Sequence, residues 1–164
     1  MVRVAAEGEL GQYRQALLTY AYRLTRDAHE AEDIVHSAML KALQALRSGE
    51  AVANVRAWLY RITHNEAVSA RRRAKLRRET CAQILPSEPA PPGREALLER
   101  VRAELDGLRE PYASALRLRY LQHLKLEEVA EVLGLPLNTV KSHMARGLRL
   151  LTERLGDALE ERRQ

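Results

Sequence analysis

The stretch over residues 126–151 predicts two helices joined by a tight turn. Gly134 can adopt the positive φ that ends a helix, and Pro136 follows where that helix cannot continue. Small Ala130 and apolar Val140 complete an Ala-x3-Gly-x5-Val skeleton, which suits two helices that cross steeply over a short turn. We therefore expect a helix-turn-helix. Its expected buried positions recur at helical spacing: Leu126, Val129, Ala130 and Leu133, then Val140, Met144 or Ala145, Leu148 and Leu151.

The second helix of this motif carries polar side chains on its expected exposed face. Such side chains can donate to phosphates or to base edges, and most of them lie near the helix N-terminus, the end that enters a major groove. The candidates for contacts to duplex DNA are Asn138, Thr139, Lys141, Ser142, His143 and Arg146. A hairpin with a merely solvated face is the alternative. Residues 137–151 contain no acidic side chain, however, whereas solvated helices mix both signs.

The remaining sequence predicts more helices and no strands, because strand-favouring clusters are absent and there is no Phe. Asp27 and Glu30 have the spacing of a capping box at a helix start. We expect helices over about residues 9–25, 28–47 and 55–78, a loop over 48–54, and further helices from about Arg94 and from Pro111. The fold class is therefore all-α.

A proline-rich segment divides the chain. The sequence PSEPAPPG over residues 86–93 holds four of the six prolines, and no helix can cross it. We expect one small helical domain over residues 1–80, a flexible linker over 81–95, and a second small domain over 96–164 that contains the helix-turn-helix.

The net charge of +5 indicates a polyanionic partner. Residues 1–80 hold 14 basic and 9 acidic side chains, whereas residues 98–164 hold 12 and 11. Six cations lie between Arg71 and Arg78. A solvated helix end would also favour cations, but so dense a group repels itself without a counter-charge. Two separate nucleic-acid contacts are the simplest explanation.

Several other functions find no support in the sequence. Cys81 is the single cysteine, which excludes an intramolecular disulfide and fits the reducing cytoplasm. The first twenty residues lack the apolar core of a signal peptide, and no run has the length of a membrane span. The five histidines lack metal-ligand spacing, and no phosphate loop or nucleophile motif occurs. We expect a cytoplasmic protein that is not an enzyme, with no metal, no cofactor and no membrane insertion.

Three blocks in this order resemble bacterial extracytoplasmic-function (ECF) sigma factors of the sigma-70 family. They are AYRLTRDAHEAEDIVHSAMLKAL, then VRAWLYRITHNEAVSARRR, and, after the proline-rich gap, LRLRYLQHLKLEEVAEVLGLPLNTVKSHMARGLRLL. The resemblance covers about residues 10–155. It implies that the first domain binds core RNA polymerase and captures the −10 promoter element as single strand. The second domain would read the −35 element as duplex, and an anti-sigma factor would hold the chain inactive.

The resemblance also implies site residues. The −10 strand would meet Arg61, Asn65, Ser69, Arg72 and Arg73, and core polymerase would meet Asp33, His36 and Ser37. Two departures from the family pattern stand out, since Ser69 replaces a usual acidic residue and His36-Ser37 replaces a usual Gln-acidic pair. The loop over 48–54 would hold a flipped base, although it lacks the usual aromatic residues.

Three further side chains have competing interpretations. Trp58 could be a stacking platform, but its spacing with Leu59 and Ile62 favours a core role. Arg117 and Arg119 are candidates for phosphate contacts or ordinary solvated arginines.

The alternative to a sigma factor is a conventional helix-turn-helix regulator that binds duplex DNA without polymerase. That alternative explains residues 126–151 equally well, but it leaves the cations over residues 71–78 without a role.

Overall fold

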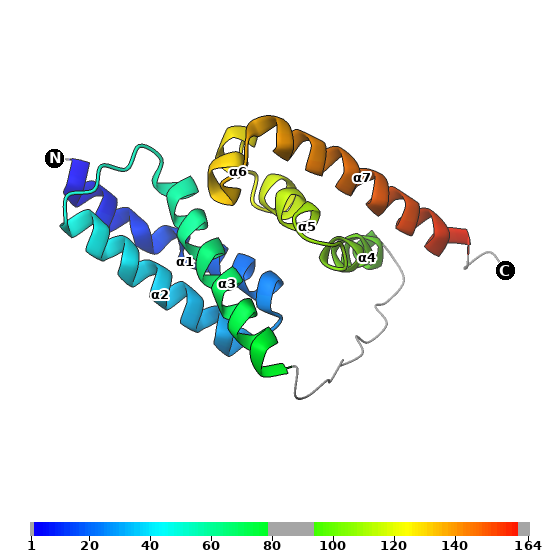
Figure 1. Cartoon of the computed structure of the whole chain (residues 1–164), viewed down its shortest axis with the longest axis horizontal. Helices are drawn as coiled ribbons and strands as arrows, with labels where there is room; N and C mark the ends of the chain where they lie inside the picture. Colours follow the sequence, from blue (N-terminus) through cyan, green and yellow to red (C-terminus); the bar gives the residue numbers. More distant parts are fainter. Residues whose placement is uncertain (1, 79–93, 161–164) are drawn as a thin grey trace. The chain divides into compact units, whose positions relative to one another are not determined.

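The structure, a computed structural model, is helical throughout the part of the chain that it describes (Figure 1). It describes the backbone of residues 2–78 and 94–160, with side chains over residues 10–73 and 98–156. The elements are α1 (Val2–Thr25), α2 (Ala28–Arg47), α3 (Val55–Arg78), α4 (Arg94–Asp106), α5 (Tyr112–Leu116), the π-helical turn η1 (Arg117–Leu121), α6 (Leu126–Leu133) and α7 (Leu137–Glu160). The all-α prediction is confirmed. The expected linker falls outside the described residues except at its last two positions, where α4 begins.

The chain divides into two compact units, one formed mainly by α1–α3 and the other mainly by α4–α7. In the first unit each of the three helices packs on both of the others. α1 begins at Val2, so the sequence placed its start too late. The expected bounds of α2 and α3 are confirmed.

The core of the first unit follows the helical periodicity of its sequence. The buried residues of α2 are the six expected ones, Ala31, Ile34, Val35, Ala38, Ala42 and Leu46. α3 contributes a stripe at helical spacing, Leu59, Thr63, Ala67 and Ala70. The hydroxyl of Thr63 is satisfied inside the helix, because Oγ1 donates to the carbonyl oxygen of Leu59 at 2.9 Å. Trp58 is only 4% exposed, which confirms its role in the core.

Side chains cap the starts of α2 and α3. Asp27 Oδ1 accepts a hydrogen bond from the backbone N–H of Glu30 at 2.9 Å, as expected. The N–H of Asp27 donates to Thr25 Oγ1 at 3.3 Å and not to the Glu30 side chain. The second hydrogen bond that a capping box predicts, from this N–H to Glu30, is therefore wrong. Asn54 Oδ1 likewise accepts from the N–H of Ala57 at 3.1 Å. These caps satisfy N–H groups that a helix start leaves without partners.

A polar contact joins α1 to α3 inside this unit. Tyr20 Oη lies 2.9 Å from His64 Nδ1, and the Tyr20 ring packs edge-on against Tyr60 with 5.4 Å between centroids. Burial raises the pKa of Tyr60 from 10.0 to about 12, and the charge of Arg56 opposes that rise. His64 is therefore half-buried and bonded to the core.

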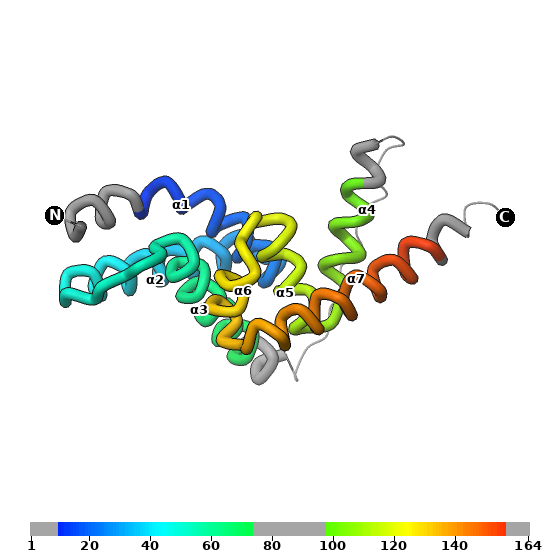
Figure 2. The backbone as a smooth tube through the Cα atoms, turned by 90° about the horizontal axis from the view of Figure 1, so that it is seen from above, coloured from blue at the N-terminus to red at the C-terminus, as the bar shows by residue number. Residues whose placement is uncertain are grey.

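The second unit is built around α7, which packs against α5 and α4 (Figure 2). Gly134 has φ +63° and ends α6, as expected. In the helix-turn-helix, Val129, Val140 and Met144 are buried as expected. Leu126, Ala130, Leu133 and Leu151 are only half-buried. Leu148 is 39% exposed, so its expected burial is wrong. Gly147 takes its place on the buried face.

The helix expected from Pro111 is interrupted. α5 ends at Leu116, and η1 widens the backbone into a π-helical turn. The N–H of Gln122 donates to the carbonyl oxygen of Arg117 at 3.0 Å, and His123 then adopts φ +54° before α6 begins. A π-helical turn breaks the regular helical periodicity, so the helix expected from Pro111 does not continue as an α-helix.

We predict that Gly147→Ala destabilises the protein. A Cβ at this position would lie 2.9 Å from Leu116 Cδ1 and 3.2 Å from Tyr112 Cβ, which forces α5 and α7 apart. The expected loss is about 1–3 kcal/mol in the free energy of unfolding, measured in urea. Gly156→Ala on the same helix is the control, because no atom lies within 4 Å of its added Cβ. That variant should gain roughly 0.5–1 kcal/mol. Equal stability changes in the two variants would contradict the packing argument.

Candidate nucleic-acid interface

The N-terminal half of α7 presents a polar face away from its buried stripe. Asn138, Lys141, Ser142 and Arg146 are exposed, and Thr139 is half-buried. Ser142 Oγ donates to the carbonyl oxygen of Asn138 at 3.0 Å. The lone pairs of the Ser142 hydroxyl oxygen can still accept a hydrogen bond from a further donor. The two cations and the two polar side chains form a surface that suits the edge of a nucleic acid.

His143 does not lie on this exposed face, contrary to expectation. Its ring packs edge-on against Tyr112 with 5.4 Å between centroids and 74° between planes. Nδ1 is buried and has no hydrogen-bond partner among the described residues. Only part of the imidazole is therefore available to DNA.

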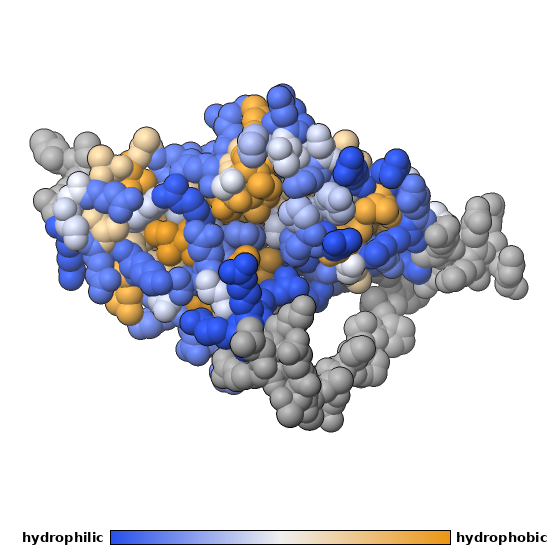
Figure 3. All heavy atoms as spheres, viewed as in Figure 1, coloured by the Kyte–Doolittle hydropathy of each residue, from blue (hydrophilic) through white to orange (hydrophobic). Residues whose placement is uncertain are grey.

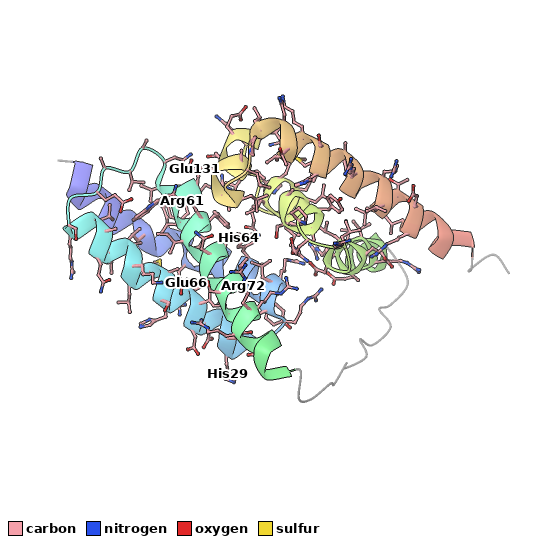
Figure 4. The ribbon with its side chains drawn as sticks, in the orientation of Figure 1. His29, Arg61, His64, Glu66, Arg72 and Glu131 are labelled. Carbon is pink, nitrogen blue, oxygen red and sulfur yellow. The ribbon has the colours of Figure 1, made fainter. Side chains whose placement is uncertain are left out.

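A second polar face lies along α3 in the first unit. Arg61, Asn65, Ser69 and Arg72 recur at intervals of four, four and three residues, so they share one side of the helix. Asn65, Ser69 and Arg72 are exposed, and Arg61 is half-buried. Figure 4 shows Arg61 and Arg72 along α3. Figure 3 shows strongly hydrophilic side chains over the described part of this helix, next to the grey atoms. The side chains of the cations after Arg73 lie outside the described residues.

Arg73 turns away from that face, although the sequence grouped it with Arg72. It lines a hollow between α2 and α3. The hollow is lined by Glu30, Asp33, Ile34, Ser37, Glu66, Ala70 and Arg73. Asp33 and Ser37, two of the three residues expected to meet polymerase, therefore lie in this hollow. The third, His36, is exposed but is not among the lining residues.

Sequence reasoning missed two carboxylates in this hollow, Glu30 and Glu66. Glu30 was interpreted only as part of a helix cap. Glu66 forms an ion pair with Lys41 of α2, which ties the two helices together along the edge of the hollow. Glu30 precedes Asp33 by three residues, and Glu66 precedes Arg73 by seven. Residues at these spacings share a helix face, and this pattern could have indicated both carboxylates from the sequence.

Arg117 is a structural residue, so the prediction of a phosphate contact or a solvated side chain is wrong. It is 3% exposed. Its Nε lies 2.8 Å from Asp106 Oδ1 and its Nη1 lies 2.9 Å from Glu110 Oε1. Arg119 is half-buried, and its Nη1 donates to the carbonyl oxygen of Leu124 at 2.9 Å. Both guanidinium groups thus hold the segment that leads into the helix-turn-helix.

Comparisons with known proteins match both units. The Sigma-70 region 2 family matches residues 10–77, and the Sigma-70 region 4 family matches residues 98–151. RNA polymerase sigma factor YlaC of Bacillus subtilis is 32% identical over 160 residues, which cover 93% of this chain and 92% of YlaC. ECF RNA polymerase sigma factor SigL of Mycobacterium tuberculosis is 30% identical over 154 residues, covering 88% and 87%. The chain belongs to the ECF sigma factors.

Solved sigma factors share its fold. The sigma factor RpoE in complex with the anti-sigma factor NepR from Bartonella quintana matches with a TM-score of 0.72 and 27% identity, covering 91% of this chain and 95% of RpoE. CnrH, solved with the cytosolic domain of CnrY, matches with a TM-score of 0.69 at 22% identity, which is a likeness of fold. Within the described part of this sigma factor, no helix could cross a membrane and no group of side chains could hold a metal ion.

We predict that Arg117→Met strongly destabilises this sigma factor. The substitution removes the guanidinium that pairs with the buried carboxylate of Asp106 and with Glu110, which costs about 3–5 kcal/mol in the free energy of unfolding. Arg102→Met is the control, because its pair with Glu99 is exposed on both sides and such pairs contribute less than about 1 kcal/mol. Urea unfolding measures both, and a similar small loss in the two variants would show that the buried pair is not required.

Proposed function

We propose that this sigma factor directs core RNA polymerase to promoters by holding two elements of one start site. The single observation that carries this proposal is the presence of two exposed cationic faces, on α3 and on α7, in units that match different regions of the same family. The first unit, with residues 1–80, binds core polymerase and the −10 element. The second, with residues 96–164, binds the −35 element. Residues 81–95 serve as the linker.

The face on α7 reads the −35 element as duplex. Asn138, Lys141, Ser142 and Arg146 are exposed near the N-terminal end of the helix, where a recognition helix meets base edges. Thr139 completes this face, and the accessible part of the His143 imidazole lies beside it. Arg117 and Arg119 support the helix-turn-helix from inside the unit.

The face on α3 captures the −10 element as single strand. Arg61 and Arg72 supply charge for the backbone, and Asn65 supplies donors and acceptors for an exposed base. Ser69 offers an uncharged hydroxyl, so this position adds no repulsion toward phosphate. Because bases are unstacked in a melted promoter, contacts to their edges and faces offset the cost of unstacking.

Asp33, His36 and Ser37 form the contact to core polymerase. Two are exposed and Ser37 is half-buried on the outer side of α2. The chain itself catalyses no reaction in this proposal and acts in the cytoplasm without a cofactor. It supplies the recognition of sequence that core polymerase lacks.

An anti-sigma factor regulates the chain by covering apolar side chains in both units. RpoE of Bartonella quintana, with which this chain shares its fold, is bound by the anti-sigma factor NepR. In this chain Leu40 and Val68 are exposed in the first unit, and Leu98, Tyr120 and Leu148 are exposed in the second. Such exposed apolar side chains favour a protein partner.

Run-off transcription tests the function. Core polymerase with the purified chain should initiate at specific promoters, and core alone should not. The alternative is a regulator that binds duplex DNA alone. Specific duplex binding by the chain, without any effect on core, would favour that alternative.

We predict that Lys141→Ala and Arg146→Ala each weaken binding to −35 duplex. A contact to a base edge is worth about 1–3 kcal/mol, whereas loss of a phosphate contact lowers the salt slope by about one unit without changing sequence preference. Fluorescence anisotropy at several salt concentrations separates the two. Arg149→Ala is the control, since its guanidinium is 73% exposed and pairs with Glu153 further along α7. Unchanged binding in both test variants would show that the recognition face is misassigned.

We predict that Asp33→Ala weakens association with core polymerase about tenfold, because a charge at an interface complements charge on the partner. The fold should persist, since Asp33 is exposed. Glu32→Ala removes the adjacent exposed acid, which is not part of the hollow, and should change affinity less. Equal core affinity for wild type and Asp33→Ala in a titration with labelled protein would remove Asp33 from the interface.

A further inference from the structure

α3 directs two adjacent arginines to different surfaces. Successive residues of an α-helix are rotated by about 100° around its axis, so Arg72 and Arg73 cannot share a face. Arg72 continues the line of Asn65 and Ser69. Arg73 instead continues the line of Glu66 and Ala70, and all three line the hollow against α2. In Figure 4, Glu66 and Arg72 are labelled on the two sides of α3.

Apart from Arg73, the charged residues that line the hollow are acidic. Its volume is about 240 Å³, which accommodates the end of one long side chain. Glu30 and Asp33 contribute carboxylates from α2, and Ile34 and Ala70 provide an apolar floor. The third carboxylate, Glu66, forms an ion pair with Lys41. Glu30 and Asp33 can therefore attract a basic side chain of a partner into this hollow, whereas the cation of Arg73 repels it.

Arg73 is placed to oppose that entry while remaining movable. Its side chain is exposed, and no ion pair among the described residues holds it to Glu30 or Asp33. Its cation nevertheless lies on the same hollow as both carboxylates, and like charges brought together at an interface are unfavourable. A long exposed side chain can turn away, but turning away separates it from the carboxylates that attract it.

We propose that Arg73 belongs to the polymerase-binding surface and not to the promoter face, and that it lowers affinity for core by competing with a basic side chain of polymerase for Glu30 and Asp33. This inference rests on the proposed function, in which Asp33 contacts core. It adds a residue that lowers the affinity of that contact for core polymerase. Arg73 acts through the two carboxylates, whereas Arg72 acts on the promoter strand.

The experiment compares Arg73→Gln with Arg72→Gln in the full-length chain. Both variants remove one exposed positive charge from neighbouring positions, so they change the overall charge equally. Affinity for core polymerase is measured by titration at low and high salt. Arg73→Gln should bind core about threefold to tenfold more tightly than wild type, and the gain should shrink at high salt. Arg72→Gln should match wild type. An unchanged or weaker affinity for Arg73→Gln, or an equal gain in Arg72→Gln, would overturn the proposal.

A second readout uses the assembled holoenzyme and a single-stranded oligonucleotide that carries the −10 element. Arg72→Gln should reduce capture of this strand, and Arg73→Gln should leave it near the wild-type level. Equal losses in the two variants would return Arg73 to the promoter face and overturn the proposal.

The third comparison places the substitutions in a double-mutant cycle. In an Asp33→Asn background, Arg73→Gln should gain much less core affinity, because one of the carboxylates for which it competes is neutral. A full gain in that background would show that Arg73 acts independently of Asp33, which contradicts the proposal. If the wild-type chain fails to bind core at all, the proposed function fails. If wild type binds and Arg73→Gln does not differ from it, only this inference fails.

Discussion

The burial of one stripe of α3 determines what every other side of that helix can do. Leu59, Thr63, Ala67 and Ala70 are buried against α1 and α2, which fixes the rotation of the helix about its axis. Small residues at two of these positions let the helices approach closely. Once the rotation is fixed, helical geometry determines which positions face α2 and which form the exposed face proposed to contact DNA. The core thus positions both surfaces of α3 for which functions are proposed.

The second unit uses a buried charge where the first uses apolar packing and one tyrosine–histidine contact. Arg117 bonds to Asp106 at the end of α4 and to Glu110 in the following turn. A buried ion pair adds little net stability relative to apolar residues, but it penalises any arrangement that separates its members. It therefore specifies one connection between α4 and the helix-turn-helix. The π-helical turn at Arg117–Leu121 directs the chain from this cluster into α6.

Local sequence patterns predicted the fold well where a helix has one strongly apolar face. All six buried residues of α2, the start of α3, and the turn at Gly134 follow from periodicity, capping and backbone preference, which are properties of neighbours in the chain. The matched regions confirm the family that the motif order suggested.

The features that the sequence could not predict depend on contacts with other helices and turns of the same chain. Arg117 looked solvated because its partners lie seven and eleven residues away across a turn. His143 looked exposed because nothing in α7 reveals that Tyr112 will cover it. Arg72 and Arg73 looked equivalent, because the run of arginines by itself does not show which one turns toward α2.

The missing side chain at Gly147 has a consequence beyond packing. Leu116 and Tyr112 approach the backbone of α7 at this point, and Tyr112 also supports His143 one turn earlier. The depth at which α7 seats in its unit is thereby set by a residue that cannot itself touch a base. Any larger group there would tilt the helix and move Lys141 and Arg146, the two cations proposed to contact duplex DNA. Under the proposed function, a substitution in the interior can therefore alter promoter choice by shifting α7, while the side chains of its exposed face stay unchanged.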